Sequence, residues 1–355
     1  MKKIVIVGGG FAGISAVKTL AKSKLELVLI DKKQSWDFLP CLPDILSQKI
    51  NPVFLTVNLA DFIKKLGGKF INQEVKSVDL AQKNLKLDSQ DLSYDYLLLC
   101  SGTKTNFFGN SEMKRQALKL DSIADAELIL SRLEKDDFDK IVVIGGGYTG
   151  IEIATNLRQR QAKPISIIEK SPNLLGTLPQ WMKDYVKANL DRLNIEVLAS
   201  SEISQIPKRT LLIWSAGVKS DDYIFNLKQN KTPQGRLKVD KYLKITDNCF
   251  VAGDIANFDY RSRPLRMSIQ FAITQGRLAA RNIINSIKGK PLTEYKPKDL
   301  GYVIPMPNNK SCGLVLGLRV KSRLATFLHY FMCIFRSESF KNKLGIIKNL
   351  IKGGA

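Results

Sequence analysis

The feature that most constrains the fold is a repeat. The segment KIVIVGGGFAGISA at residues 3–16 recurs as KIVVIGGGYTGIEIA at residues 140–154. Each copy opens with a short apolar, β-branched run of the kind that forms a strand buried on both faces, and the run ends at a glycine turn followed by a helical pattern. Two complete copies are not expected by chance, so the sequence predicts two similar strand–turn–helix units in one chain.

Both turns carry glycines at the GxGxxG spacing. In that pattern one glycine turns the chain, one lets the backbone approach a pyrophosphate, and one lets the helix pack closely on the strand. The helix N-terminus then directs its N–H groups at the phosphates. A second strand ends in an acid in each copy, Asp31 after the first turn and Glu169 after the second, where a carboxylate can accept hydrogen bonds from a ribose. One dinucleotide in each copy is the simplest interpretation.

Further glycine turns follow other predicted strands. Ser101-Gly102 follows the apolar run at residues 97–100, Gly253-Asp254 follows the run at 249–252, and LLIWSAGV leads into Gly217. Ligands of open α/β sheets lie at the carboxyl ends of the strands, so these turns are expected to face a ligand. Between them the sequence predicts a helix at residues 184–193, a β-pair in GRLKVDKYLKI, and a helix beginning near Ser268.

The composition excludes several classes of protein. With 355 residues, of which 44% are hydrophobic, the chain can form two or three packed domains. Neither a signal peptide nor a transmembrane helix is expected. The five cysteines are scattered without a CxxC pair, which argues against a structural zinc site and a redox-active dithiol, and no metal ligands are expected. The net charge of +22 favours an acidic partner, but no nucleic-acid-binding motif accompanies it.

The C-terminal tail has a different character. At 100° per residue, its first helical segment places Leu324, Phe327, Leu328, Phe331, Met332, Ile334 and Phe335 on one half of the circumference. The opposite half carries Thr326, His329 and Arg336, and we expect the sole histidine to be a packing residue at an interface rather than a catalytic one. From Arg319 to the end there are eight Lys or Arg and one acid. This pattern is typical of a helix lying on an anionic membrane surface, although a cover for the core or a homodimer interface would show it too.

The paired GGGFAG and GGGYTGIE turns, with CSGT, WSAGV and VAGD, resemble the two-dinucleotide-domain flavoproteins related to glutathione reductase, over about residues 1–290. Within these, WDFLPCLPDIL, YDYLLLCSGTKTNFFG, IQFAITQG and the basic tail are most similar to the type II NADH dehydrogenases, which are single-subunit NADH:quinone oxidoreductases that pump no protons. The resemblance implies two Rossmann-like α/β domains, the second inserted in the first. It places FAD on residues 1–106 and 240–303, NAD on 107–239, and a membrane-associating segment at 304–355.

The resemblance also implies the site residues. FAD is expected on Gly8, Gly10, Phe11, Ala12, Gly13, Asp31, Lys32, Val75, Ser101, Gly102, Gly253, Asp254, Gln270, Phe271 and Ala272. NADH is expected on Gly145, Gly147, Tyr148, Thr149, Gly150, Glu169, Ala216 and Gly217. Glu152 and Gln270 are the expected catalytic residues, near the nicotinamide and at the quinone entrance. The expected partners are a membrane quinone and the anionic cytoplasmic face of a cell membrane, to which the protein would bind peripherally.

Some residues depart from the family pattern and keep other acceptors open. Ile269 and Thr274 replace an alanine and a glutamine of the AQxAxQ motif, and Leu300 stands where a lysine usually precedes Gly301. A peroxidase, oxidase or disulfide reductase using Cys41 alone is one alternative, and a ferredoxin or rubredoxin reductase is another. A redox-sensing or nucleic-acid-binding flavoprotein is the alternative from a different class.

Overall fold

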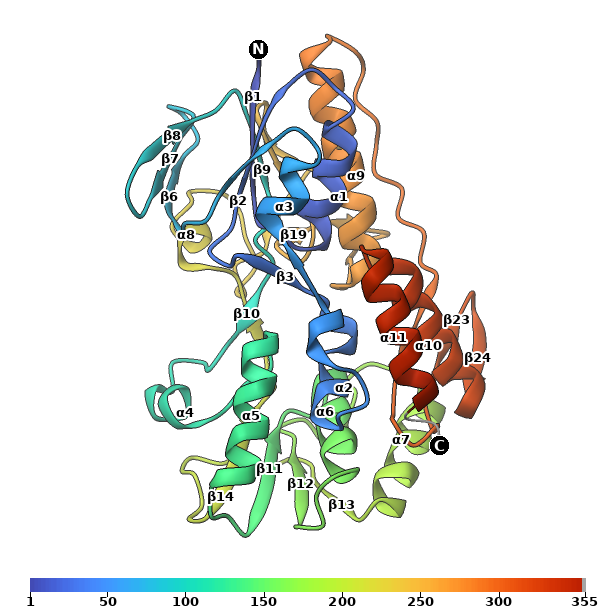
Figure 1. Ribbon diagram of the computed structural model, residues 1–355. Coiled ribbons are helices and arrows are strands. Elements are labelled where there is room, and N and C mark those ends of the chain that lie inside the picture. Colours follow the sequence, from blue (N-terminus) through green and yellow to red (C-terminus); the bar gives the residue numbers. More distant parts are fainter. Residues whose placement is uncertain (353–355) are drawn as a thin grey trace. The chain divides into compact units, whose positions relative to one another are not determined.

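The computed structural model describes residues 1–352, which divide into two compact units (Figure 1). Unit 1 comprises residues 1–36, 57–104 and 218–299, and unit 2 comprises 37–56, 105–217 and the described residues from 300 to 352. The large middle segment of unit 2 therefore interrupts unit 1 in the sequence. Residues 37–56 fall in unit 2 and residues 218–239 in unit 1, which differs from the domain bounds predicted above.

Unit 1 is built around a six-stranded sheet in the order β17-β18-β9-β1-β2-β5, parallel except for the edge strand β17. The strands are β1 (Lys3–Val7), β2 (Glu26–Ile30), β5 (Lys69–Ile71), β9 (Tyr96–Leu99), β17 (Lys244–Thr246) and β18 (Cys249–Val251). The central strands are almost entirely buried because helices cover the sheet, as their unbroken apolar runs require. The helices are α1 (Phe11–Leu20), α3 (Leu59–Lys64), α8 (Asp222–Phe225) and α9 (Ile269–Ile287).

Helices α1 and α9 pack closely in unit 1 because of a glycine. A Cβ on Gly276 of α9 would lie 2.1 Å from the carbonyl oxygen of Ala12 in α1, so only glycine permits this approach. Small sheets complete the unit: β6 (Val75–Asp79), β7 (Asn84–Leu87) and β8 (Asp91–Ser93); β16 (Leu237–Lys238) with β19 (Ala256–Asn257); β20 (Asp259–Tyr260) with β21 (Arg263–Pro264). The strand β15 (Val218–Lys219) opens the last segment of the unit.

The predicted β-pair in GRLKVDKYLKI is wrong. β16 pairs in parallel with β19, whereas β17 pairs with β18 at the edge of the main sheet. Asp240 explains the difference, since its Oδ1 accepts hydrogen bonds from the N–H groups of Tyr242 and Lys244, both at 2.8 Å. This turn sends the chain from one sheet to another instead of back along the same strand.

Unit 2 repeats the architecture with a parallel sheet in the order β13-β12-β11-β14. These strands are β11 (Lys140–Ile144), β12 (Ile165–Ile168), β13 (Ile195–Leu198) and β14 (Thr210–Trp214). Its helices are α2 (Pro43–Leu46), α4 (Ser111–Gln116), α5 (Ile123–Lys135), α6 (Tyr148–Arg158) and α7 (Gln180–Arg192), with the short 3-10 helices η1 (Leu39–Cys41) and η2 (Pro52–Phe54). The helix predicted at 184–193 is α7, which begins one turn earlier, directly after Pro179.

The C-terminal part of unit 2 is an antiparallel meander followed by two helices. Its elements are β22 (Gly301–Ile304), β23 (Cys312–Val315), β24 (Leu318–Lys321), α10 (Ser322–Arg336) and α11 (Phe340–Lys352). Three short strands lie where the chain passes between the units: β3 (Ser35–Asp37), β4 (Thr56–Asn58) and β10 (Lys104–Thr105). Within residues 1–352, no helix has the length and apolar character needed to cross a membrane.

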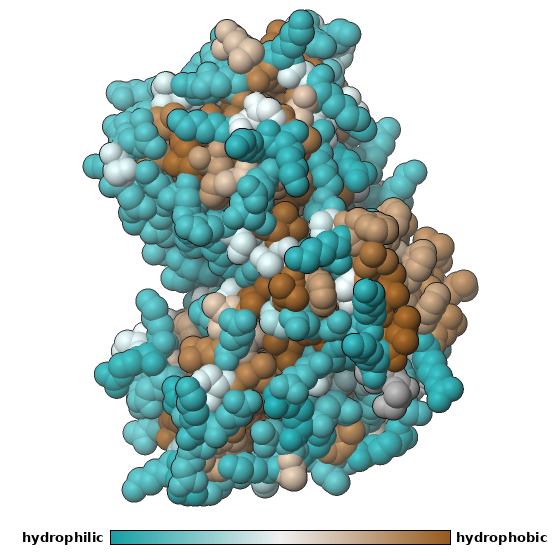
Figure 2. Space-filling model, viewed as in Figure 1, coloured by the Kyte–Doolittle hydropathy of each residue, from teal (hydrophilic) through white to brown (hydrophobic). Residues whose placement is uncertain are grey.

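The two tail helices turn their bulky apolar face outward. Leu324, Phe327, Phe331 and Phe335 of α10 are exposed, as are Phe340, Leu344 and Ile351 of α11, and hydrophobic atoms gather over these helices in Figure 2. The buried side of α10 carries Ala325, Thr326, Tyr330 and Cys333 instead. The first tail segment forms the helix α10, whose less apolar side packs inward, and its role as an amphipathic membrane segment stays a prediction.

Candidate dinucleotide sites

The glycine turn of unit 1 has the geometry that its spacing predicts. Gly8 follows β1 with φ +106°, and a Cβ there would lie 2.4 Å from the carbonyl oxygen of Cys100. A Cβ on Gly13 would lie 1.9 Å from the carbonyl oxygen of Gly8, so α1 can pack this closely only with glycine at that position. A Cβ on Gly10, the N-cap of α1, would meet nothing within 4 Å, which leaves the backbone open to an approaching ligand.

The acid after β2 is held in place beside this turn. The Oδ2 of Asp31 accepts a hydrogen bond from the N–H of Gly9 at 2.7 Å, and its Oδ1 accepts one from the N–H of Lys33 at 2.8 Å. The side chain of Lys32 forms an ion pair instead, with its Nζ 3.3 Å from Asp221 Oδ1. Asp31 therefore lies at the turn, and its role as a ribose ligand stays a prediction.

Two further turns lie at the same sheet edge, since β9 and β18 run parallel to β1. Gly102 and Gly253 both adopt positive φ, +68° and +81°. Within residues 1–352, the buried Oγ of Ser101 has no hydrogen-bond partner by geometry, which leaves it able to bind a polar ligand. Burial raises the pKa of Asp254, whereas the nearby Arg236 guanidinium opposes the rise. These features fit an extended, polyhydroxylated diphosphate along the edge.

The N-terminus of α9 meets the same edge. A Cβ on Gly253 would lie 3.2 Å from the Cβ of Ala12 and 3.8 Å from that of Ala272, so this turn sits between the starts of α1 and α9. Gln270 and Ala272, like Phe271, are buried in the first turn of α9, and Gln270 Nε2 donates to Asp299 Oδ1 at 3.0 Å.

Phe11 and Val75 are the remaining residues of unit 1 that were predicted to bind FAD. The ring of Phe11 packs edge-on against Trp36 with centroids 4.9 Å apart. Val75 begins β6 of the separate three-stranded sheet, and its role stays a prediction.

The glycine turn of unit 2 reproduces the first. Gly145 has φ +104°, a Cβ on Gly150 would lie 1.8 Å from the carbonyl oxygen of Gly145, and a Cβ on Gly147 would meet nothing within 4 Å. Tyr148 packs edge-on against Tyr302, and Thr149 is exposed. The near-identity of two turns separated by more than a hundred residues shows that the repeated sequence produces repeated geometry.

Glu169 is fixed as Asp31 is. Its Oε2 accepts a hydrogen bond from the N–H of Gly146 at 2.7 Å and its Oε1 one from the N–H of Ser171 at 2.7 Å. Partial burial would raise the pKa of Glu169, but these N–H donors hold it below its usual value. The carboxylate is therefore charged at neutral pH.

Beyond β14, the ring of Phe108 lies over the turn at Gly217, a contact that the sequence did not indicate. Gly217 has φ +70°, and a Cβ there would lie 2.3 Å from the ring of Phe108. Ala216 precedes it and packs under the first glycine of the turn, Gly145. Phe108 itself is largely exposed, so its ring is available to a ligand.

Glu152 lies one turn into α6. Burial raises the pKa of Glu152 to about 8. Two charged neighbours have smaller effects, since His329 lowers this pKa and Asp44 raises it. Nearby, Tyr330 Oη donates to Asp44 Oδ1 at 2.6 Å, and burial raises the pKa of Asp44 to about 6. Sequence analysis missed this pair because its members lie almost three hundred residues apart.

His329 is partly buried in α10, and its role as a packing residue at an interface stays a prediction. Its Nε2 lies 3.5 Å from the Sγ of Cys333, one helical turn further on. The S–H of Cys41 and the His329 ring lower the pKa of the Cys333 thiol despite its burial, and the Cys333 sulfur raises the pKa of His329 despite the burial of the ring. Three chemically reactive side chains thus meet where the sequence predicted none.

Two parallel sheets, each with a GxGxxG turn opening a helix and an acid fixed beside it, define a protein that binds two dinucleotides. A family model described as pyridine nucleotide-disulphide oxidoreductase matches residues 2–276, and the chain belongs to this family.

Relatives extend the match over almost the whole chain. A type II NADH:quinone oxidoreductase of Staphylococcus haemolyticus is 25% identical, covering 92% of this chain and 93% of its own. The demethylphylloquinone reductase NdbB of Synechocystis is 24% identical, covering 97% and 94%. The structure of NDH2 from Plasmodium falciparum in complex with NADH superposes with a TM-score of 0.87 at 20% identity, covering 99% of this chain and 98% of that one.

Proposed function

We propose that this protein is an FAD-dependent NADH:quinone oxidoreductase that does not pump protons. The observation that carries the proposal is the pair of matching glycine turns, each able to bind one dinucleotide. The relatives support it, since two of them are named for reactions with quinones. FAD, when bound, supplies a carrier that takes a hydride from NADH and passes two electrons to an acceptor.

The proposal assigns FAD to unit 1. The N–H groups at the start of α1 would bind its pyrophosphate, with Asp31 at the ribose. The Ser101 hydroxyl, which lacks a partner within residues 1–352, and the turn at Gly253 would bind the rest of the chain of hydroxyls and phosphates. The remaining predicted FAD residues, Lys32 and Val75 among them, belong to the same proposal.

NADH is assigned to the turn of unit 2. The charged Glu169 would accept hydrogen bonds from the adenosine ribose and would repel the additional phosphate of NADPH. The open backbone at Gly147 and the start of α6 would bind the pyrophosphate. Glu152, with its pKa near 8, would hold a proton at neutral pH close to the place where the hydride leaves.

Quinone is the proposed acceptor, and Gln270 the residue at its entrance. Gln270 lies at the start of α9, beside the turn at Gly253 to which the proposal assigns FAD. Thr274 stands in place of the motif's second glutamine and hydrogen-bonds Tyr295 Oη at 2.8 Å. Thr274 and Tyr295 thus form a hydrogen-bonded pair at this point of α9.

The alternative that uses Cys41 as a lone redox cysteine is disfavoured by its surroundings. Cys41 is fully buried, and burial raises the pKa of its thiol well above the usual value. A nucleophilic cysteine needs the opposite, an accessible thiolate of lowered pKa.

Membrane association is proposed from the outward face of α10 and α11. Water-exposed phenylalanines at this density are costly unless covered, and a quinone dissolved in lipid must reach its site without entering water. The same segment carries bases from Arg319 to Lys352, which suit an anionic cytoplasmic leaflet. A homodimer that covers the same face would instead give a soluble protein, and fractionation distinguishes the two.

The test measures NADH oxidation by the purified protein with quinones, ferricyanide, oxygen and disulfides as acceptors. Two matched variants separate the cofactor sites. Gly13→Ala should lose bound flavin, whereas Gly150→Ala should keep the flavin absorbance but reduce it slowly with NADH, because each new Cβ would clash with a carbonyl at under 2 Å. Turnover with disulfides but not quinones would refute the proposed acceptor.

A further inference from the structure

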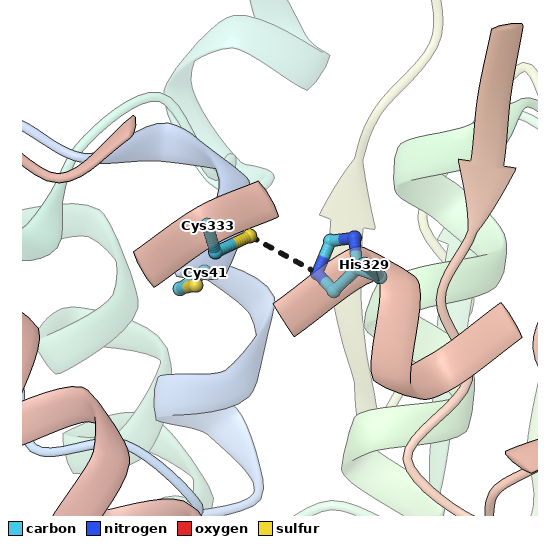
Figure 3. A group of neighbouring side chains, drawn as sticks. All are labelled: Cys41, His329 and Cys333. Atoms are coloured by element: carbon cyan, nitrogen blue, oxygen red, sulfur yellow. Dashed lines mark hydrogen bonds between the residues drawn. The ribbon is translucent and has the colours of Figure 1, made fainter. Parts of the chain in front are cut away.

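Cys41, His329 and Cys333 form a cluster in unit 2 (Figure 3). One ligand atom from each, the two sulfurs and an imidazole nitrogen, all lie within 4.8 Å of one another. Cys41 is the last residue of η1, whereas His329 and Cys333 come from one face of α10 at a spacing of four residues. The cysteines are buried and the histidine is partly buried.

The arrangement agrees with tetrahedral coordination. Zinc–sulfur bonds of about 2.3 Å and zinc–nitrogen bonds of about 2.0–2.1 Å give a sulfur–nitrogen edge of about 3.6 Å and a sulfur–sulfur edge of about 3.8 Å. The observed Sγ to Nε2 distance between Cys333 and His329 is 3.5 Å. Because the three atoms lie within 4.8 Å of one another, the Cys41 sulfur needs to approach the other two by only about 1 Å to complete such a face.

The local structure holds the two sides of the cluster together. Three residues beyond Cys41, Asp44 accepts the hydrogen bond of Tyr330, which lies between His329 and Cys333 in α10. The Nζ of Lys49 lies 4.5 Å from the centre of the Tyr330 ring. The ligands are therefore positioned by contacts that do not depend on the ion.

Charge favours a divalent ion. Two thiolates, a neutral imidazole and a divalent cation sum to zero, and a buried site is stable only when its charges are compensated. Soft thiolate ligands with an imidazole select zinc over magnesium or calcium. Three protein ligands leave a fourth position, which water fills in sites of this kind.

We propose that Cys41, His329 and Cys333 bind one Zn²⁺ ion, which joins the segment before α2 to the tail helix α10. The cluster lies within electrostatic reach of Glu152 but uses none of the residues assigned to the dinucleotides, and the proposal does not depend on the identity of the electron acceptor. It also gives Cys41 and Cys333 a function other than catalysis.

The test uses full-length protein purified without a metal-binding tag or chelators. Elemental analysis should find one zinc per chain, and X-ray absorption should find two sulfurs and at least one nitrogen around it. Cobalt substitution should give d–d absorption in the red, where the flavin is transparent. Cys333→Ala and His329→Gln should weaken zinc binding by roughly 100-fold or more, since even indirect partners of a metal contribute about 10–100-fold. The control is Cys312→Ala, which removes another buried cysteine of unit 2 and should leave zinc bound.

Three results would overturn the proposal. One is protein that holds no zinc although zinc is supplied in the buffer, and whose five cysteines all react as free thiols once it is unfolded. Another is a Cys41–Cys333 disulfide found by mass spectrometry in metal-free protein, which would make the pair a redox couple. The third is full zinc content in Cys333→Ala. Circular dichroism and flavin retention check that each variant folds, and the absorption spectra of the unmodified protein test the site without any variant.

Discussion

Replacing the three exposed phenylalanines of α10 should detach the protein from membranes. Phe327, Phe331 and Phe335 keep 64%, 53% and 69% of their surface exposed, and the first two rings stack with centroids 6.1 Å apart. A phenylalanine offers roughly 150–250 Å² of burial, so the three together keep roughly 300–400 Å² in water. At about 25 cal/mol per Å², full insertion would contribute about 8–10 kcal/mol.

Insertion to half that depth still contributes about 4 kcal/mol, which corresponds to about a thousandfold in partitioning. The change is the triple substitution of these phenylalanines by serine, and the assay is flotation with neutral and anionic vesicles. Deleting the tail after Arg323 is a poorer test, because it also removes Tyr330 and leaves the buried Asp44 without its donor.

The matched control replaces Leu128 and Leu198, two exposed leucines of unit 2 outside the tail, by serine. We expect the unmodified protein and this control to float with vesicles and to resist high salt, because apolar contacts are not screened. The triple variant should stay in solution and still reduce ferricyanide. Unchanged flotation of the triple variant, or an unmodified protein found wholly in the soluble fraction, would refute the reasoning.

Four further predictions concern single side chains. Replacing Glu169 by Gln should raise kcat/KM for NADPH relative to NADH, and equal use of both by the unmodified protein would contradict the assigned role. Gln270→Trp should slow flavin reoxidation by quinone while reduction by NADH continues in stopped flow; loss of flavin would instead indicate a structural residue. In the folded protein Glu152 keeps its proton up to about pH 8, whereas in the unfolded chain it loses the proton near the ordinary pKa of 4.5. Its contribution to the free energy of unfolding therefore falls as the pH rises between these two values. Glu152→Gln should flatten that pH dependence, measured by urea titration. Tyr330→Phe should lower the free energy of unfolding by about 1–3 kcal/mol, because the buried Asp44 carboxylate loses its hydrogen-bond donor. An unchanged free energy of unfolding would contradict this, since it would mean that water can donate to Asp44 instead.

The sequence determined the two nucleotide-binding frameworks because their signals are local. A buried strand, a glycine turn and the following helix lie within fifteen residues, and the steric need for glycine at Gly13 and Gly150 arises from carbonyl groups only five residues earlier. Helix periodicity is local too, so the faces of α10 were predictable. The β-pair failed because the side chain of Asp240 directs the chain to a different sheet, which residue patterns alone do not reveal.

Only the tertiary structure decided which face of α10 packs inward and what it meets there. The spacing of the cysteines argued against a zinc site, because spacing reveals only ligands that lie close together in the sequence. Cys41 and Cys333 are almost three hundred residues apart and come together only when the chain folds. The same holds for Asp44 and Tyr330. Periodicity identifies two sides of a helix, but the partner surface selects the buried one, and here it selected the side that carries a tyrosine hydroxyl, a thiol and an imidazole.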